Sequence, residues 1–179
     1  NPISTGWDLI DNITKGGLGR SELGVVIAPT GAGKSMALVH LGAMALQAGF
    51  NVVHYTLELQ DKVVASRYDS CITGISLQDV KDQKEQVWEC IKDVPGKLII
   101  KEYPTASASA VHFRTLLNEL NLKRNFVPDI IFIDYLNICC SSRIKPGASI
   151  NSYTYVKAIA EELRGLAVEF NVPVVSATQ

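Results

Sequence analysis

The stretch "IAPTGAGKS", from Ile27 to Ser35, joins small residues to a lysine and a hydroxyl. Glycine loses backbone entropy on folding and buries no side chain, so such a stretch adds little to a core. It follows an apolar run and precedes a helical pattern, which is the context of a phosphate-binding loop. Backbone N–H groups and a helix N-terminus can surround an anion there. Gly31 and Gly33 are expected to let the backbone approach the phosphates closely.

Two side chains close this loop with distinct chemistry. Lys34 is expected to reach the outer phosphates of a nucleotide, and the Ser35 hydroxyl is expected to serve Mg²⁺. The strict pattern G-x-x-x-x-G-K-[ST] has glycine where this chain has Ala28. We expect alanine to be tolerated, because a strand end needs no positive φ. The alternative is an ordinary glycine turn without a ligand.

A second candidate anchor lies in "IIFIDYLN", where four apolar residues precede Asp134. This pattern is typical of a buried strand that delivers one carboxylate at its C-terminal end. Ligands of open α/β sheets bind at that edge, so Asp134 is predicted to hold Mg²⁺ through a water. The alternative is an aspartate that only caps a turn.

Hydrolysis also needs a group that orients or deprotonates the attacking water. Glu58 in "YTLEL" is the candidate, because it also follows an apolar strand-like run. Gln179 ends "VVSATQ" and offers an amide that can respond to the γ-phosphate. Capping of the next helix is the alternative for Glu58, and an ordinary strand end is the alternative for Gln179.

The elements that must position these residues alternate along the chain, which predicts an α/β fold with a mostly parallel sheet flanked by helices on both faces. A helix after a Ser4 or Thr5 cap opens the chain, and Asp61 is expected to cap a later one. Strands are predicted at 23–28, 51–59, 97–103, 128–138 and 172–179. Further helices are predicted at 34–49, 61–74, 76–94, 109–126 and 153–170.

Composition bounds the class of protein. The 179 residues suffice for one domain with a core, and a formal net charge of −1 excludes a uniformly basic nucleic-acid-coated surface. The 4 cysteines form no C-x-x-C pair, which disfavours a zinc site and favours a reducing, cytoplasmic setting. We expect no signal peptide and no membrane association. The chain starts without methionine and stops at Gln179, directly after an apolar strand-like run, so we expect a fragment that lacks an N-terminal domain and the C-terminal end of the core.

The order of these motifs resembles RecA-like P-loop ATPases, and the detail resembles the DnaB family of hexameric replicative helicases. The resemblance is carried by "STGWDLIDNITKGGLGRSELGVVIAPTGAGKS", "TLELQDKVVASR", "FIDYLNI" and "ELRGLAVEFNVPVVSATQ". "SSRIK" beside "IDYLNICC" is similar to the T-even bacteriophage members of that family. The resemblance covers nearly the whole chain, as a single RecA-like domain at 1–179, and is weakest between Ser76 and Asn125.

The resemblance implies an ATP-dependent DNA helicase that uses Mg²⁺, translocates 5′-to-3′ on single-stranded DNA and forms a hexameric ring. It implies a primase and a helicase loader as partners, and a location in the cytoplasm of a bacterial host. By position, the resemblance implies that Lys34, Glu58 and Gln179 are catalytic, that Ser35 and Asp134 serve the metal, and that Arg67 matches a family arginine. It also implies that the phosphates are held by Thr30, Gly31, Ala32, Gly33, Lys34 and Ser35. No residue can be assigned as the arginine finger.

The loop at 141–154 is the one local basic feature placed to meet DNA, through Arg143 and Lys145. Copies of this loop in a ring would gather positive charge without a basic protein. The alternative is a solvated surface loop. Three other functions stay open: a RecA-class recombinase filament, a DNA-independent signalling ATPase and a small-molecule kinase, although no acceptor site or arginine-rich lid supports the last. We expect the 179-residue chain alone to be monomeric and nearly inactive.

Overall fold

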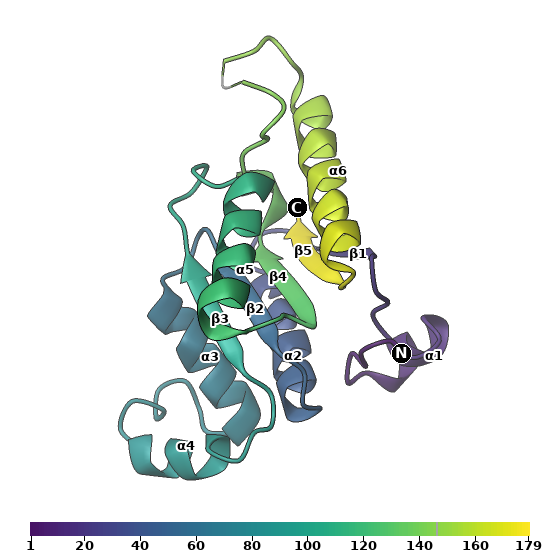
Figure 1. Cartoon of the computed structure of the whole chain (residues 1–179). Helices are drawn as coiled ribbons and strands as arrows, with labels where there is room; N and C mark the ends of the chain where they lie inside the picture. The colour runs from purple at the N-terminus through teal and green to yellow at the C-terminus, as the bar shows by residue number, and fades with distance from the viewer. Residues whose placement is uncertain (146) are drawn as a thin grey trace.

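Within residues 1–145 and 147–179, which the computed structural model describes, five short strands form one sheet. All of its neighbouring strands are parallel, and the spatial order is β1-β5-β4-β2-β3 (Figure 1). The strands are β1 (Leu23–Ile27), β2 (Val52–Thr56), β3 (Leu98–Glu102), β4 (Ile130–Asp134) and β5 (Val174–Thr178). The predicted parallel α/β sheet is confirmed.

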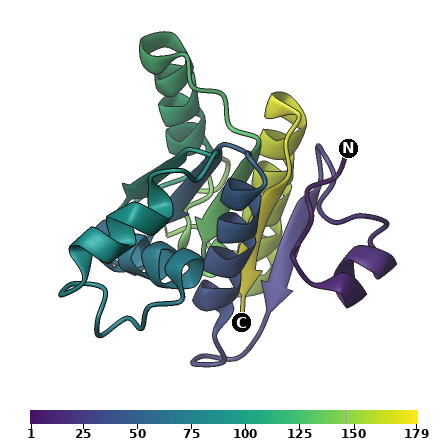
Figure 2. The ribbon, with the colours of Figure 1, turned by 90° about the horizontal axis from the view of Figure 1, so that it is seen from below.

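Helices cover both faces of this sheet, as predicted. One layer contains α2 and α3, and the other contains α5 and α6, so the sheet lies between them (Figures 1 and 2). The helices are α1 (Asp8–Ile13), α2 (Lys34–Gln47), α3 (Asp61–Thr73), α4 (Lys84–Ile91), α5 (Ala110–Arg124), the 3-10 helix η1 (Leu136–Ile138) and α6 (Ser152–Phe170). None of the helices described is both long and apolar enough to cross a membrane.

The central strand β4 explains why the sheet needs two helical layers. Ile130 and Phe132 are buried against the α2–α3 layer, whereas Ile131 and Ile133 are buried against the α5–α6 layer. Successive side chains of a strand point to opposite faces, so a continuous apolar run must be covered on both. The same alternation sends Asp134 toward the α2 side.

The parallel register brings the chemistry-bearing segments to one edge of the sheet. Thr56 of β2 is level with Asp134 of β4, and Ile27 of β1 is level with Thr178 of β5. The phosphate loop, Glu58, Asp134 and Gln179 therefore all follow or end strands at this carboxyl edge, where ligands of open α/β sheets bind.

The helix predicted over 76–94 is shorter in the structure. Residues 77–82 form turns, and α4 covers only Lys84–Ile91. The first of these turns is closed by local bonds: the Ser76 hydroxyl donates to the Asp79 carboxylate at 2.8 Å and accepts from the Asp79 backbone N–H at 3.3 Å. Leu77 in this turn is 44% exposed.

Both predicted caps were wrong. Trp7 is the N-cap of α1, and the Ser4 and Thr5 hydroxyls instead donate to the Asp11 carboxylate. At α3, Gln60 is the N-cap, and the backbone N–H of Asp61 donates to Glu102 at the end of β3, at 3.1 Å. The bond to Glu102 joins residues 41 positions apart, so sequence spacing does not reveal it.

Two predicted strands were too long at their C-terminal ends. The strand predicted at 51–59 stops at Thr56, so Glu58 lies in a bend. The strand predicted at 128–138 stops at Asp134, beyond which the chain forms η1. Pro146, within the predicted loop, lies outside the described residues.

The leading segment docks on the core of its own chain. Ile3 is buried and pairs with Leu18 in an isolated bridge. The Trp7 ring stacks on His40 of α2 with 4.1 Å between ring centroids. Leu9 and Ile13 of α1 nevertheless remain 73% exposed, so only part of this apolar segment is covered.

Candidate active site

The phosphate loop connects β1 to α2 at the carboxyl edge of the sheet. Gly31 and Gly33 have φ of +79° and +93°, and Gly33 is the N-cap of α2. Open space surrounds both positions, so the cost of a side chain there would be backbone strain. The first amides of a helix lack intrahelical acceptors, which leaves those of Lys34 and Ser35 available to an anion.

Ala28 occupies the position where the strict phosphate-loop pattern has glycine. Its φ is not positive, and its backbone N–H donates to the carbonyl of Thr178 at 3.1 Å. This geometry agrees with the prediction that alanine is tolerated.

Lys34 is only 7% exposed although it carries a charge. Its Nζ lies over the Tyr135 ring, 4.5 Å from the centroid. A cation over an aromatic face is stabilised by the ring quadrupole, which compensates part of the lost hydration. Sequence reasoning missed Tyr135 as a site residue, and its position directly after Asp134 was the only available signal.

Asp134 is 1% exposed, and its Oδ1 atom has no hydrogen-bond partner among the residues that the structure describes. Burial raises the pKa of this carboxyl, and the negative charge of Glu58 adds to the rise. The Ser35 hydroxyl, Lys34 and Arg67 oppose that rise in pKa. A buried carboxylate oxygen without a partner is costly, so the donor set fits a cation beside Ser35.

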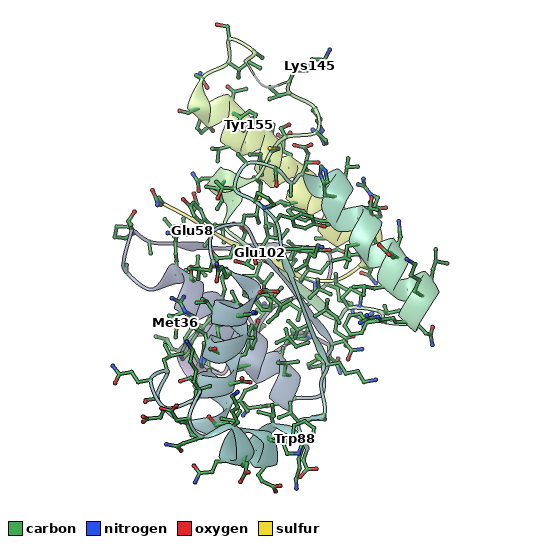
Figure 3. All side chains as sticks on the ribbon, turned by 90° about the vertical axis from the view of Figure 1, so that its left-hand side faces the viewer. Met36, Glu58, Trp88, Glu102, Lys145 and Tyr155 are labelled. Atoms are coloured by element: carbon green, nitrogen blue, oxygen red, sulfur yellow. The ribbon has the colours of Figure 1, made fainter. Side chains whose placement is uncertain are left out.

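Glu58 lies two residues beyond β2 and is exposed. Its neighbour Leu57 donates its backbone N–H to the carbonyl of Asp134 at 3.0 Å, which fixes the bend beside the end of β4. In Figure 3, Glu58 lies between Met36 of the first turn of α2 and the loop that carries Lys145. The structure thus brings Glu58 and Asp134 together, and leaves Glu58 open to solvent.

Two further predicted residues reach the same edge. Gln179 is exposed directly after β5, beside the phosphate loop that β1 carries. Arg67 of α3 is half-buried and near enough to Asp134 to lower the pKa of its carboxyl. Within the described residues Arg67 has no carboxylate within 4.0 Å, so its charge is available to a ligand.

The DNA loop predicted at 141–154 ends earlier, because α6 begins at Ser152. Residues 139–145 and 147–151, here called the 139–151 loop, extend away from the sheet before that helix (Figure 1). Arg143 forms an ion pair with Glu161 of α6 at 3.4 Å, and both side chains are more than half exposed. Lys145 is exposed and, among described residues, makes no such pair. The start of the loop is held to α6, because Ser142 donates its backbone N–H to the buried Glu162 at 2.7 Å.

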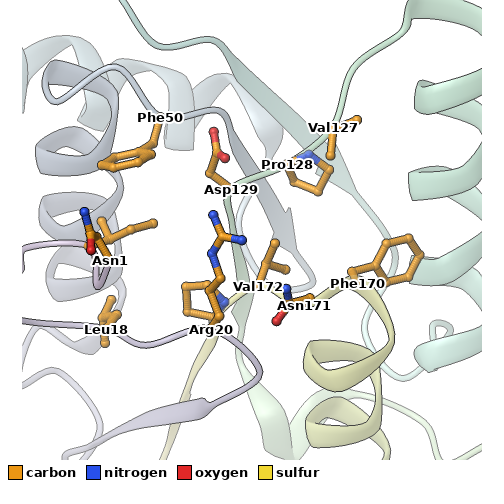
Figure 4. A pocket seen from close by; sticks show the side chains of 12 residues that line it. Asn1, Leu18, Arg20, Phe50, Val127, Pro128, Asp129, Phe170, Asn171 and Val172 are labelled. Carbon is orange, nitrogen blue, oxygen red and sulfur yellow. The ribbon is translucent and has the colours of Figure 1, made fainter.

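A cavity of about 210 Å³ lies elsewhere, at the amino ends of β4 and β5 (Figure 4). Its lining includes Arg20, Asp129 and Asn171. Asp129 accepts a hydrogen bond from the backbone of Asn51 at 2.8 Å. This cavity is at the opposite edge from the phosphate loop and is separate from the candidate active site.

Fold and site together define a RecA-like domain of the P-loop class. Two solved structures resemble it with TM-scores of 0.78 at 19% identity: a DnaB-like replicative helicase studied with its interactions with primase, and an isolated ATPase domain. Both likenesses cover 100% of this chain, and they cover 43% and 64% of those chains.

The model of the DnaB-like helicase C-terminal domain matches residues 2–179, so the chain belongs to that family. It is 46% identical over 96% of its length to the DnaB-like replicative helicase of Enterobacteria phage T4. It is 25% identical over 99% of its length to the replicative DNA helicase DnaB of Mycoplasma pneumoniae. The chain spans only 38% and 39% of these two relatives.

Proposed function

We propose that this domain is the ATP-hydrolysing motor of a replicative DNA helicase, and that it acts on single-stranded DNA with 5′-to-3′ polarity. The observation that carries the proposal is the buried Asp134 carboxylate, whose free oxygen lies with Ser35 and Lys34 at the phosphate loop. Family membership supports the same activity. A recombinase or a signalling ATPase would not explain the match to the helicase family over residues 2–179.

The residues at the carboxyl edge fit a Mg²⁺-bound nucleotide. Amides of the loop from Thr30 to Ser35 would surround the phosphates, and Lys34 would leave the Tyr135 ring to bind the outer ones. Ser35 and Asp134 would hold Mg²⁺, which when bound neutralises phosphate charge. Burial disfavours the carboxylate charge of Asp134 and raises its pKa, and a cation would relieve that cost.

Glu58 would orient the attacking water and accept its proton. Its position beyond β2 places a carboxylate beside Asp134 while leaving it open to water. Gln179, at the end of β5, would donate its amide to the γ-phosphate and lose that bond on hydrolysis. Asp134 would thus bind the metal, Glu58 would activate water and Gln179 would sense the γ-phosphate.

The 139–151 loop would contact the DNA backbone through Lys145 and Arg143. The Arg143–Glu161 pair is exposed, and exposed pairs are worth only ~0–1 kcal/mol, so a phosphate can compete for the arginine. Assembly into a hexameric ring in the bacterial cytoplasm would bring several loops to one strand. Primase and a helicase loader would be further partners of the whole protein.

The test is ATP turnover by the full-length parent, with and without single-stranded DNA, for wild type and Glu58→Gln. We expect DNA to raise wild-type turnover, and Glu58→Gln to lower it by roughly 10²-fold or more while nucleotide binding persists. Glu102→Gln is a matched control at the end of the neighbouring strand β3. Its amide oxygen can still accept from the N–H of Asp61.

Turnover that ignores DNA would refute the motor and favour a signalling ATPase. Cooperative coating of DNA without unwinding of a forked duplex would favour a recombinase filament. Equal losses in Glu58→Gln and Glu102→Gln would remove Glu58 from its assigned role.

A further inference from the structure

Thr178, the last residue of β5, connects three parts of the candidate site. Its carbonyl accepts the N–H of Ala28, at the start of the phosphate loop, at 3.1 Å. Its hydroxyl donates to Oδ1 of Asn137, in η1, at 2.7 Å. Its own peptide bond leads to Gln179. One residue therefore contacts the phosphate loop, the predicted γ-phosphate sensor and the segment that leads to the 139–151 loop.

Asn137 lies on the short route from the metal site to that loop. It follows Asp134 by three residues, and the helix η1 that contains it packs against both β5 and α6. Leu136 is buried in the core beneath α6, which leaves little freedom for η1 to move alone. Because η1 cannot move alone, a displacement of Asn137 also displaces the residues that follow it in the chain.

The far end of this route is held to α6. The backbone N–H of Ser141 donates to the Tyr155 hydroxyl at 3.1 Å, and both polar groups of Ser142 donate to Glu162. Glu162 is 7% exposed, and among the described residues its second carboxylate oxygen has no hydrogen-bond partner. Loss of the Ser142 bonds would leave this buried carboxylate without a donor, so the start of the loop stays joined to α6.

Among the described residues, the Thr178–Asn137 bond is the only side-chain hydrogen bond that joins the end of β5 to η1. A shift of the phosphate loop or of Gln179 moves Thr178 directly, because both are bonded to it. The shift reaches η1 through this bond, and reaches the loop through the chain that continues from η1.

We propose that Thr178 and Asn137 are positioning residues that couple the nucleotide state of the phosphate site to the 139–151 loop. The inference rests on the proposed function, since it assumes that nucleotide binds at one end and DNA at the other. Neither residue touches the reacting atoms, so their loss should change coupling and leave the chemistry in place.

The experiment measures two quantities in the full-length parent. One is the ratio of ATP turnover with and without single-stranded DNA. The other is the gain in affinity for single-stranded DNA on adding a nonhydrolysable ATP analogue. Coupling is reciprocal for binding, so both quantities should fall together.

Thr178→Val removes the hydroxyl and keeps the shape, and Thr178→Ser keeps the hydroxyl. We expect Thr178→Val to lower both quantities about threefold to tenfold, the factor carried by one hydrogen bond, with DNA-free turnover within about twofold of wild type. Thr178→Ser should retain them. Thr115→Val is the matched control, because within the described part of the chain the Thr115 hydroxyl donates only to the carbonyl of Val111 in α5.

Asn137→Ala provides a second, independent variant, and the double variant completes a cycle. If the double variant lowers the two measured quantities by the same factor as either single variant, the two residues act through one bond, as proposed. If the effects of the two single variants add, the proposal is overturned. The proposal is also overturned if Thr178→Val leaves both measured quantities at their wild-type values. If wild-type turnover itself does not respond to DNA, the proposed function fails, which this experiment distinguishes from failure of the inference alone.

Discussion

Gly42, in the middle of α2, lies where that helix packs against Tyr68 of α3. A Cβ atom at this position would lie 2.1 Å from the Tyr68 hydroxyl oxygen and 2.8 Å from two of its ring carbons. Tyr68 cannot easily move away, because it is 1% exposed and its hydroxyl lies 2.7 Å from Nδ1 of the buried His54. Gly42→Ala therefore forces a shift in the packing of α2 on α3.

The expected size of this effect comes from three contributions. Overpacking a core by one methyl costs ~1–3 kcal/mol, and disturbing the bond to His54 adds ~1 kcal/mol or more. Alanine favours a helix over glycine by about 1 kcal/mol, which offsets part of the cost. We therefore expect Gly42→Ala to lower the free energy of unfolding by ~1–3 kcal/mol.

Gly165 of α6 is the matched control. Apart from the adjoining backbone of α6, no atom of the described residues lies within 4 Å of a Cβ built there, so Gly165→Ala should gain up to about 1 kcal/mol from helix propensity alone. Urea unfolding followed by circular dichroism measures both variants, and adding Tyr68→Phe should recover part of the Gly42→Ala loss. A Gly42→Ala protein as stable as Gly165→Ala would refute the assigned helix contact.

Three further predictions concern the candidate site. Asp134→Asn should raise the thermal midpoint of the nucleotide-free protein, since it removes a buried charge whose carboxyl pKa is raised, and should abolish the extra stabilisation by Mg²⁺ with nucleotide. Because a raised pKa protonates Asp134 earlier on acidification, Mg²⁺-dependent nucleotide affinity, titrated from about pH 8 down, should fall at a higher pH than for an ordinary aspartate. Glu161→Gln should strengthen DNA binding by up to about fivefold at low salt by freeing Arg143, as fluorescence anisotropy would measure, and equal affinity would remove Arg143 from the DNA contacts.

The parallel α/β class, the phosphate loop and the sheet edge where the site forms could all be predicted from the amino-acid sequence. Apolar runs between helical patterns are local signals, and so are Gly33, Lys34 and Ser35. Parallel strands share one carboxyl edge, so the expectation that Glu58, Asp134 and Gln179 gather there followed from topology alone.

Contacts between segments far apart in the chain depend on the tertiary structure. The position of Tyr135 beneath Lys34, the bond that Glu102 supplies to the start of α3 and the bond from Thr178 to Asn137 join different elements, and spacing does not encode them. The helix predicted at 76–94 is also shorter in the structure, since residues 77–82 form turns that the apolar periodicity does not distinguish from a helix. Burial, which raises the pKa of Asp134, exists only once both helical layers cover the sheet.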